Sequence, residues 1–286
     1  LEVVIDEESA ASACTDTGNI IGRLKGSKKD CRPILLVAHM DTVTPGEGIE
    51  PVIKEGIIYS KGDTILGADD KSGIAAIFEA IRHIKENNIT HGDIEVLFTF
   101  GEETGLLGAR YLNRELIRSR IGFVLDSGGE PGTIINRGPA QDKIEAVIHG
   151  KASHAGANPE EGISAIQVAA RAIDRMRLLR IDAETTANIG VILGGQATNI
   201  VCDRVEVKGE ARSLSDEKLD SQTRHMVECI EEACREFGAK ADIITERMYP
   251  AFYVPEEDPI IKQAKKAAGK AGLRARVTSS GGGSDT

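Results

Sequence analysis

The stretch ILLVAHMDTV, Ile34–Val43, places His39 and Asp41 two positions apart, directly after an unbroken apolar run. A short apolar run of this kind predicts a strand buried on both faces, as in a parallel sheet covered by helices. Alternate side chains of an extended chain point to the same side, so His39 and Asp41 are expected side by side at the end of the strand. In open α/β sheets, functional residues collect past the carboxyl ends of the strands. The stretch therefore predicts both the fold class and the edge where a site would lie.

The residues around this stretch continue an alternation of strands and helices. The segments PILLVAH (33–39), IEVLFTF (94–100) and IGFVLD (121–126) are the clearest strands. Residues 70–88 predict a helix with one apolar face, formed by Ile74, Ile77, Phe78, Ile81 and Ile84. The pattern predicts an α/β domain with a mostly parallel sheet flanked by helices.

From about Gln141 the order changes to strand, helix, strand, strand, helix, strand. These elements are expected at 143–150, 162–179, 187–193, 204–212, 216–237 and 241–247. This order is typical of a ferredoxin-like α+β unit. Residues 258–272 and 273–279 then predict a helix and a strand that resume the first domain. We therefore divide the chain into a first domain over 1–138, an inserted domain over 139–250 and a return to the first domain over 251–286.

The composition excludes several classes of protein. The 286 residues carry a formal net charge of -10 without any Lys/Arg-rich run, so binding to nucleic acid or to an anionic membrane surface is not expected. No apolar run is long enough to span a bilayer. Five cysteines, an odd number without C-x-x-C spacing, predict reduced thiols in a cytoplasmic protein.

Acidic and His side chains follow several of the predicted strands. They are His39 with Asp41, Asp69 with Asp70, Glu102 with Glu103, and Asp126. Each group alone has an ordinary interpretation, as a polar strand end, a helix cap or a solvated turn. Gathered at one sheet edge, uncompensated carboxylates would repel one another, which raises their pKa values and costs stability. A divalent cation would remove that conflict.

The residue types at this edge indicate which metal would bind. Imidazole and carboxylates without a thiolate suit zinc, or a similar metal such as Co or Mn. His39 would be a ligand, and Asp41 would accept the free ring N–H and fix its tautomer. The adjacent Glu102 and Glu103 point in different directions, so one can bind metal while the other stays free. A free carboxylate beside metal-activated water is a general base.

The motifs LLVAHMDTV, GADDKSGIAAI, FTFGEETGLLGA and VLDSGG, in this order and at these separations, resemble those of the co-catalytic zinc exopeptidases related to peptidase T. The wider family includes acetylornithine deacetylase and succinyl-diaminopimelate desuccinylase. The resemblance covers nearly the whole chain, including the inserted domain. It implies that this domain acts as a lid and dimerisation domain, and that the complete protein binds two zinc ions per subunit.

The resemblance also implies a role for each strand-end residue. Four side chains would bind metal: His39 and Asp126 on one zinc, Glu103 on the other, and Asp69 bridging the two. Glu102 would be the general base, and Asp41 would hold His39.

Three residues of the inserted domain match family positions that act on the substrate. GKASHAG resembles the lid motif, which implies that His154 stabilises the oxyanion, often in the active site of the partner subunit. Asn199 in QATNIVCDR and Arg212 in GEARS stand where family members contact the substrate. From the residues alone, His154 is a surface-loop histidine, Asn199 a turn residue and Arg212 a strand-end residue, and these interpretations stay open.

The sequence departs from the family pattern near Thr286. A two-metal site of this kind needs a second histidine, which the family supplies after a Gly-rich turn resembling SSGGGSDT, whereas the last histidine here is His225 in a predicted helix. We expect the chain to be part of a longer protein, cut at both ends, with the missing ligand beyond Thr286. A flexible Gly/Ser tail is the alternative interpretation of that segment.

The sequence favours a metal-dependent peptide hydrolase. It would be an aminopeptidase that acts on tripeptides or other short peptides through a di-zinc-activated water, and that forms a homodimer through the inserted domain. An N-acyl amino acid deacylase on the same fold is an alternative, because both reactions cleave an amide next to a charged group. A non-catalytic binding protein is a further alternative, against which the intact ligands and the proposed base argue.

Overall fold

The computed structural model describes residues 1–286, and these form two compact units. Unit 1 contains Leu1–Thr133, Ala267–Arg274 and Ser284–Thr286. Unit 2 contains Ile134–Lys266 and Ala275–Gly283. The domain boundaries drawn from the sequence, after residues 138 and 250, stay a prediction.

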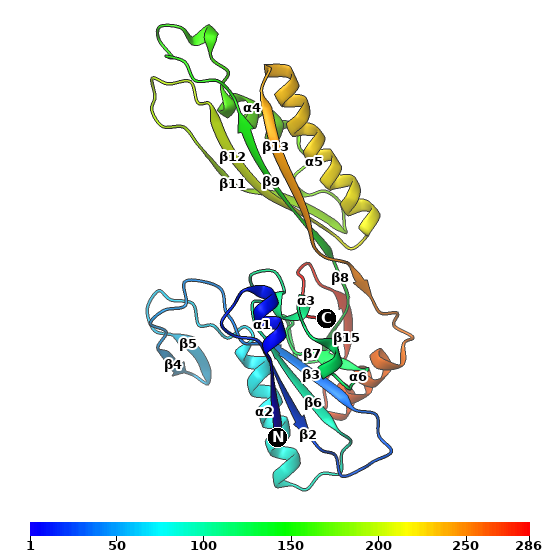
Figure 1. Cartoon of the computed structure of the whole chain (residues 1–286). Coiled ribbons are helices and arrows are strands. Elements are labelled where there is room, and N and C mark those ends of the chain that lie inside the picture. Colours follow the sequence, from blue (N-terminus) through cyan, green and yellow to red (C-terminus); the bar gives the residue numbers. More distant parts are fainter. The chain divides into compact units, whose positions relative to one another are not determined.

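Unit 1 is built on a five-stranded sheet in the order β1-β2-β6-β3-β7 (Figure 1). The strands are β1 (Glu2–Asp6), β2 (Asn19–Leu24), β3 (Ile34–His39), β6 (Ile94–Thr99) and β7 (Gly122–Val124). β3 pairs in parallel with both β6 and β7, whereas β2 pairs antiparallel with β6 and with β1. The three strands that carry candidate site residues are therefore the parallel part of a mixed sheet, and their carboxyl ends lie at one edge.

Both faces of this sheet are covered, which explains the unbroken apolar runs in β3 and β6. On one face, Ala38 and Val96 pack against Ile77 and Ile81 of helix α2 (Lys71–Glu86). On the other face, Ile21, Val37 and Leu97 pack against apolar side chains such as Leu112, Leu116 and Ile117. Phe78, expected on the buried face of α2, is 52% exposed and lies at the margin, where its ring contacts Phe98.

Asp70 starts α2. It is the N-cap residue, and its side chain accepts a hydrogen bond from the backbone N–H of Gly73 at 3.1 Å. The cap places the start of the helix directly after Asp69, at the same sheet edge as His39.

The rest of unit 1 consists of short elements. Helix α1 (Glu7–Ala13) follows β1, and helix α3 (Leu107–Arg110) and a 3-10 turn at Arg114–Leu116 lie between β6 and β7. The strands β4 (Pro51–Lys54) and β5 (Ile57–Ser60) form an antiparallel hairpin between β3 and α2 (Figure 1).

Unit 2 contains an antiparallel sheet in the order β10-β11-β12-β9-β13. Its strands are β9 (Ala140–His149), β10 (Leu179–Arg180), β11 (Thr185–Gly194), β12 (Arg204–Ser213) and β13 (Lys240–Tyr249). Helices α4 (Ala165–Arg175) and α5 (Asp216–Phe237) lie on one face of this sheet (Figure 1). The ferredoxin-like order predicted from the sequence is confirmed, and the core between helices and sheet includes Ile144, Ile148, Val205, Leu219 and Met226.

The remaining elements form a small sheet in the order β14-β8-β15. Its strands are β8 (Thr133–Gly138), β14 (Phe252–Tyr253) and β15 (Arg276–Ser279), and helix α6 spans Pro259–Lys270. The helix and the strand predicted after Pro250 are both present, but the strand joins this small sheet and not the five-stranded sheet of unit 1. None of the helices has the length and apolar composition that a membrane crossing would need.

Candidate metal centre

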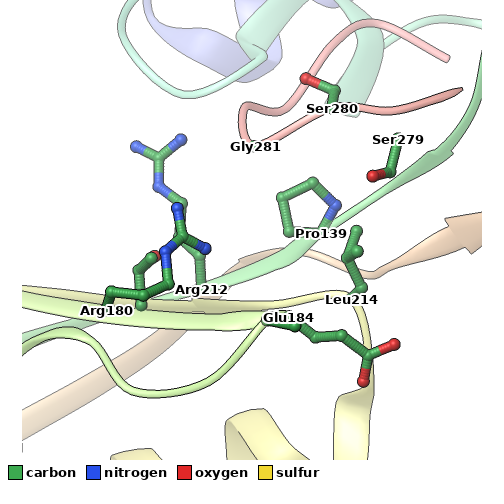
Figure 2. A pocket seen from close by; sticks show the side chains of 10 residues that line it. Pro139, Arg180, Glu184, Arg212, Leu214, Ser279, Ser280 and Gly281 are labelled. Atoms are coloured by element: carbon green, nitrogen blue, oxygen red, sulfur yellow. The ribbon is translucent and has the colours of Figure 1, made fainter.

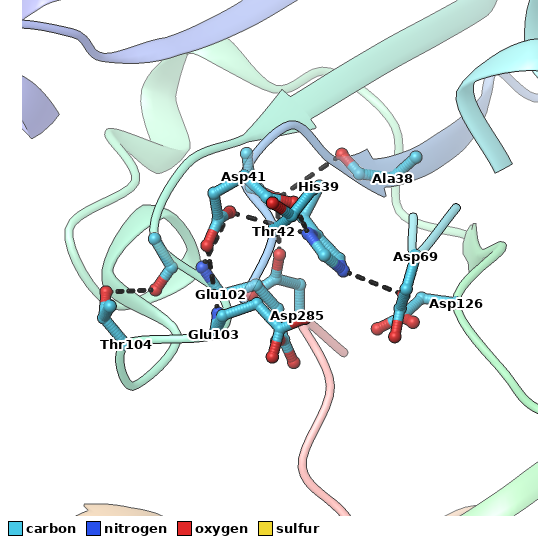
Figure 3. Close-up of polar contacts among 12 residues, drawn as sticks. Ala38, His39, Asp41, Thr42, Asp69, Glu102, Glu103, Thr104, Asp126 and Asp285 are labelled. Carbon is cyan, nitrogen blue, oxygen red and sulfur yellow. Dashed lines mark hydrogen bonds and ion pairs between the residues drawn. The ribbon is translucent and has the colours of Figure 1, made fainter. Parts of the chain in front are cut away.

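His39, the last residue of β3, lies at the middle of a group of carboxylates in unit 1 (Figure 3). His39 as a whole residue is 2% exposed, since it continues the buried strand. Asp69 comes from the loop before α2, Glu102 and Glu103 follow β6, and Asp126 follows β7. The structure thus brings together, from four separate segments, every metal-binding candidate that the sequence placed in this domain.

The two ring nitrogens of His39 face different partners. Nδ1 lies 3.0 Å from the backbone carbonyl oxygen of Asp41 and 3.5 Å from its carboxylate. Nε2 lies 3.2 Å from Oδ1 of Asp69. Two acceptors at Nδ1 favour the tautomer with the proton there, so Nε2 is the atom that can bind a metal on the side of Asp69.

The carboxylate of Asp41 also makes two hydrogen bonds that were not predicted from the sequence. Its Oδ1 and Oδ2 accept hydrogen bonds from the backbone N–H groups of Glu102 and Glu103, each at 3.1 Å. Asp41 therefore holds both His39 and the backbone of the Glu102–Glu103 pair.

Two sets of side chains bring their potential ligand atoms within 4.8 Å of one another. One set is His39, Asp69 and Asp126, and the other is His39, Glu102 and Glu103. The carboxylates of both glutamates therefore lie close to His39. Their positions alone do not show which of them would bind metal and which would act as the general base.

The electrostatics of the group favour binding of a cation. Burial and the charge of Asp69 raise the pKa of Asp126 to about 7, and burial and the charges of Asp126 and Asp285 raise the pKa of Glu102 to about 8. Burial lowers the pKa of His39, but the hydrogen bond to Asp41 and the surrounding carboxylates outweigh it and raise that pKa to about 10. One imidazole thus faces several carboxylates that repel one another, and a divalent cation bound by these oxygen and nitrogen donors would balance them.

Asp285 belongs to the same group and was not predicted. Its carboxylate accepts a hydrogen bond from the hydroxyl of Thr99 at the end of β6, and its Oδ1 is shielded from solvent without a partner. Burial raises the pKa of Asp285. The only sequence signal was an Asp after the Gly-rich run SSGGGS, which does not follow an apolar strand.

The three remaining candidates, His154, Asn199 and Arg212, belong to unit 2. Nδ1 of His154 accepts hydrogen bonds from the backbone N–H groups of Gly156 at 3.2 Å and Ala157 at 3.0 Å, so the ring proton belongs on Nε2. Asn199 is exposed, and its backbone carbonyl accepts the N–H of Ala155 at 2.9 Å, next to the histidine. Arg212 donates to Glu210 through Nε at 2.9 Å and Nη2 at 3.1 Å.

Two family profiles match the chain. The peptidase dimerisation domain matches residues 134–238, and peptidase family M28 matches residues 19–168. The first match covers most of unit 2, and the second includes all five of the metal-centre candidates His39, Asp69, Glu102, Glu103 and Asp126.

Individual relatives match nearly the whole chain. The uncharacterised protein YqjE of Bacillus subtilis is 51% identical over 94% of this chain and 72% of its own length. The crystal structure of aminopeptidase PepT from Bacillus cereus is 50% identical, with a TM-score of 0.88, over 99% of this chain and 76% of that one. A tripeptidase structure from Staphylococcus aureus is 43% identical, with a TM-score of 0.93, over 100% and 76% of the two chains.

Proposed function

The chain belongs to the exopeptidases of families M20 and M28, the group that includes peptidase T and acetylornithine deacetylase, and from this premise we propose that it is a metal-dependent aminopeptidase of tripeptides and other short peptides. The observation that carries the proposal is the convergence of His39 and the carboxylates at one sheet edge. The relatives whose names specify an aminopeptidase and a tripeptidase support the substrate class.

The metal centre would be formed by four side chains. His39 and Asp126 would hold one ion, Glu103 would hold the second, and Asp69 would lie between the two. Zinc suits this donor set, with Co or Mn as alternatives. When bound, the ions would activate a water molecule and polarise the scissile carbonyl.

Glu102 is the proposed general base. It would take a proton from the attacking water and deliver it to the leaving amine. Asp41 supports this role, because its carboxylate holds the N–H groups of both glutamates and so fixes the direction in which each side chain leaves the backbone. Thr99 and Asp285 would restrain the end of β6 just before this pair.

His154, Asn199 and Arg212 would act on the substrate. His154 would donate its Nε2–H to the oxyanion, a role that its two Nδ1 hydrogen bonds support by keeping the ring proton on Nε2. Asn199 and Arg212 would contact the peptide. Homodimer formation through unit 2 belongs to the same proposal and is supported by the dimerisation-domain match. A cytoplasmic location is proposed from the reduced-thiol pattern of the five cysteines.

The proposal is tested by measuring zinc content and turnover on the gene product. Tripeptides, N-acetyl amino acids and N-succinyl amino acids would be offered in parallel. Zinc-dependent release of the N-terminal residue of tripeptides is the expected result. Preference for the acylated amino acids would assign a deacylase, and a zinc-loaded protein that turns over none of the three would assign a binding protein.

A further inference from the structure

Unit 1 contains a buried polar network that includes none of the metal-centre candidates. One atom of this network, Oδ1 of Asn19, is shielded from solvent without a partner. The pocket of about 350 Å³ in unit 2, lined in part by Ser279–Gly281, is different, because none of its side chains has a buried polar atom that lacks a partner (Figure 2). A buried polar atom left unpaired costs stability, so the network of unit 1 calls for an explanation.

Three residues near the start of the chain form the centre of this network. Asp6, Ser9 and Asn19 are each at most 1% exposed. The backbone N–H of Asn19 donates to the hydroxyl of Ser9 at 3.1 Å, and this hydroxyl donates to the backbone carbonyl of Asp6 at 2.7 Å. The carboxylate of Asp6 accepts the N–H of Ser9 at 3.2 Å and that of Asn113 at 2.9 Å. The end of β1, the start of α1 and the start of β2 are therefore held together in the interior.

The side-chain amide of Asn19 extends the network to α3. Its Nδ2 donates to the backbone carbonyl of Gly108 at 2.9 Å and lies 3.4 Å from the carboxylate of Asp6. Both partners are acceptors, which fixes the orientation of the amide with Nδ2 toward them. A Cβ atom on Gly108 would lie 2.6 Å from Oδ1 of Asn19 and 2.7 Å from the carbonyl oxygen of Phe100. Only glycine therefore allows this close contact.

Gly108 closes the loop that carries the proposed base and ligand, Glu102 and Glu103. Its N–H donates to the carbonyl oxygen of Phe100, the first residue after β6, at 2.8 Å. The two N–H groups that precede it donate to the two carbonyl groups that follow Phe100, each at 3.0 Å. The loop thus returns to its own start, and Asn19 holds the point at which it closes.

The backbone of this loop is strained. Leu106 is in the left-handed region, with a φ of 58° and a ψ of 37°, and it is buried. A bulky residue keeps this conformation only where the surrounding structure enforces it. Asp41 holds the tip of the loop by accepting the N–H groups of Glu102 and Glu103, each at 3.1 Å. Asn19 holds the base of the loop, so the two contacts restrain it from opposite ends.

We propose that Asn19 is a positioning residue, which acts through Gly108 to fix the direction in which Glu102 and Glu103 face the metal centre. Its effect on catalysis rests on the proposed peptidase function, whereas its effect on the loop does not. Without the Asn19 contact the folded protein opens this loop more often, and the base and the ligand leave their places together.

The first test needs no turnover and so separates this inference from the proposed function. Exchange of the backbone amide hydrogens is followed by NMR on the whole protein. In Asn19→Ala, exchange at Glu102 and Glu103 is expected to accelerate about 10- to 100-fold, because a buried hydrogen bond that keeps the loop closed is lost. Amides of β12 in unit 2 are expected to exchange as in the wild type. Asn19→Ser, whose hydroxyl is shorter than the amide, is expected to behave alike and replaces Asn19→Ala if that variant does not fold.

Ser9→Ala is the matched control for this measurement. It removes a buried hydroxyl from the same network but leaves the bond between Asn19 and Gly108 in place. We expect it to lower the stability of unit 1 without selective acceleration at the two glutamates. Equal acceleration in Ser9→Ala, or none in the Asn19 variants, overturns the inference.

The second test measures tripeptide turnover with zinc in excess. In Asn19→Ala, kcat is expected to fall about 10- to 100-fold with KM nearly unchanged, because a small displacement of the base slows the reaction without removing a group that binds the peptide. Ser9→Ala is expected to keep the wild-type kcat at a temperature where both variants are folded. A wild-type kcat in Asn19→Ala, despite faster exchange of the loop, overturns the positioning role. A wild type that cleaves no peptide would refute the proposed function and leave the exchange result standing.

Discussion

Asp41 and His39 are two residues apart at the end of β3, and Nδ1 of the imidazole lies 3.0 Å from the backbone carbonyl and 3.5 Å from the carboxylate of Asp41. The same carboxylate accepts two backbone N–H groups from the loop after β6. A single side chain thus couples the orientation of a candidate ligand to the loop that carries the candidate base.

Asp41→Asn tests this coupling. Asparagine has one acceptor oxygen for two N–H donors and no charge beside the ring, so zinc affinity is expected to fall about 10- to 100-fold. Zinc affinity is measured by competition with a chelating dye, and Asp16→Asn, which changes an exposed aspartate of unit 1, is the control. Unchanged affinity in Asp41→Asn would mean that the loop and the ring are held by other contacts.

The variants Glu102→Gln and Glu103→Gln test which of the two glutamates is the general base and which is the metal ligand, because their positions alone do not distinguish these roles. Removing a general base costs about 10²- to 10⁴-fold in rate, so Glu102→Gln is expected to lose turnover and keep its zinc. Glu103→Gln is expected to lose zinc as well as turnover. Metal content by mass spectrometry and tripeptide hydrolysis are measured on the same samples. An active, zinc-replete Glu102→Gln would refute the assignment.

How much of this site the sequence predicts depends on what precedes each residue. His39, Glu102 and Asp126 were found because each follows an apolar strand, and parallel strands end at a common edge. Asp285 was missed because it follows a glycine run, and its contact with Thr99 joins positions 186 residues apart. The hydrogen bonds of Asp41 to the Glu102–Glu103 backbone also depend on loop conformation, which no periodicity encodes.

The same limit applies to the sheets. The apolar runs of β3 and β6 predicted a parallel core, but nothing in β1 or β2 indicated that they extend it antiparallel. The two-residue strand β10 at the edge of the unit 2 sheet was also missed, because it is too short to leave a pattern in the sequence.

Zinc should stabilise unit 1. The crowded carboxylates repel one another without a cation, and a bound metal would relieve this repulsion. A metal that binds only the folded state adds about 2.7 kcal/mol to the free energy of unfolding when its free concentration is 100 times its dissociation constant. Thermal unfolding is measured after chelation and after addition of zinc, with magnesium as the control cation. His39→Asn, which weakens a proposed ligand, should reduce the rise in Tm. An equal rise in that variant would place the bound zinc elsewhere.

The neutral rings of His154 and His225 should be opposite tautomers, and a single NMR spectrum can show both. Nδ1 of His154 accepts two N–H groups, whereas Nε2 of His225 accepts the N–H of Arg177 at 3.1 Å. Two-bond 1H–15N correlation at pH 8 should therefore show the proton on Nε2 of His154 and on Nδ1 of His225. The same tautomer in both rings would contradict the local hydrogen bonding, and with it the donor role proposed for His154.

His225 should also make unit 2 less stable in acid. Burial and the charge of Arg177 lower the pKa of His225, and the charges of Glu228 and Glu232 only partly oppose this. Because the folded-state pKa lies below the unfolded value of 6.5, the unfolded chain binds more protons between the two values. The stabilisation is therefore complete above pH 6.5 and is lost as the pH falls through the folded-state pKa. Protonation of Nε2 would also remove the acceptor for Arg177.

The measurement is urea unfolding of the wild type and of His225→Gln between pH 7.5 and pH 5, followed by circular dichroism. Glutamine can accept the N–H of Arg177 and does not titrate, so the variant should lose less stability on acidification than the wild type. His149→Gln, at an exposed histidine 2.9 Å from Asp242 in the same unit, should instead keep the acid sensitivity that comes from His225. If His225→Gln and the wild type lose the same stability between these pH values, the acid sensitivity of unit 2 arises from other groups, because only the imidazole of His225 has been removed.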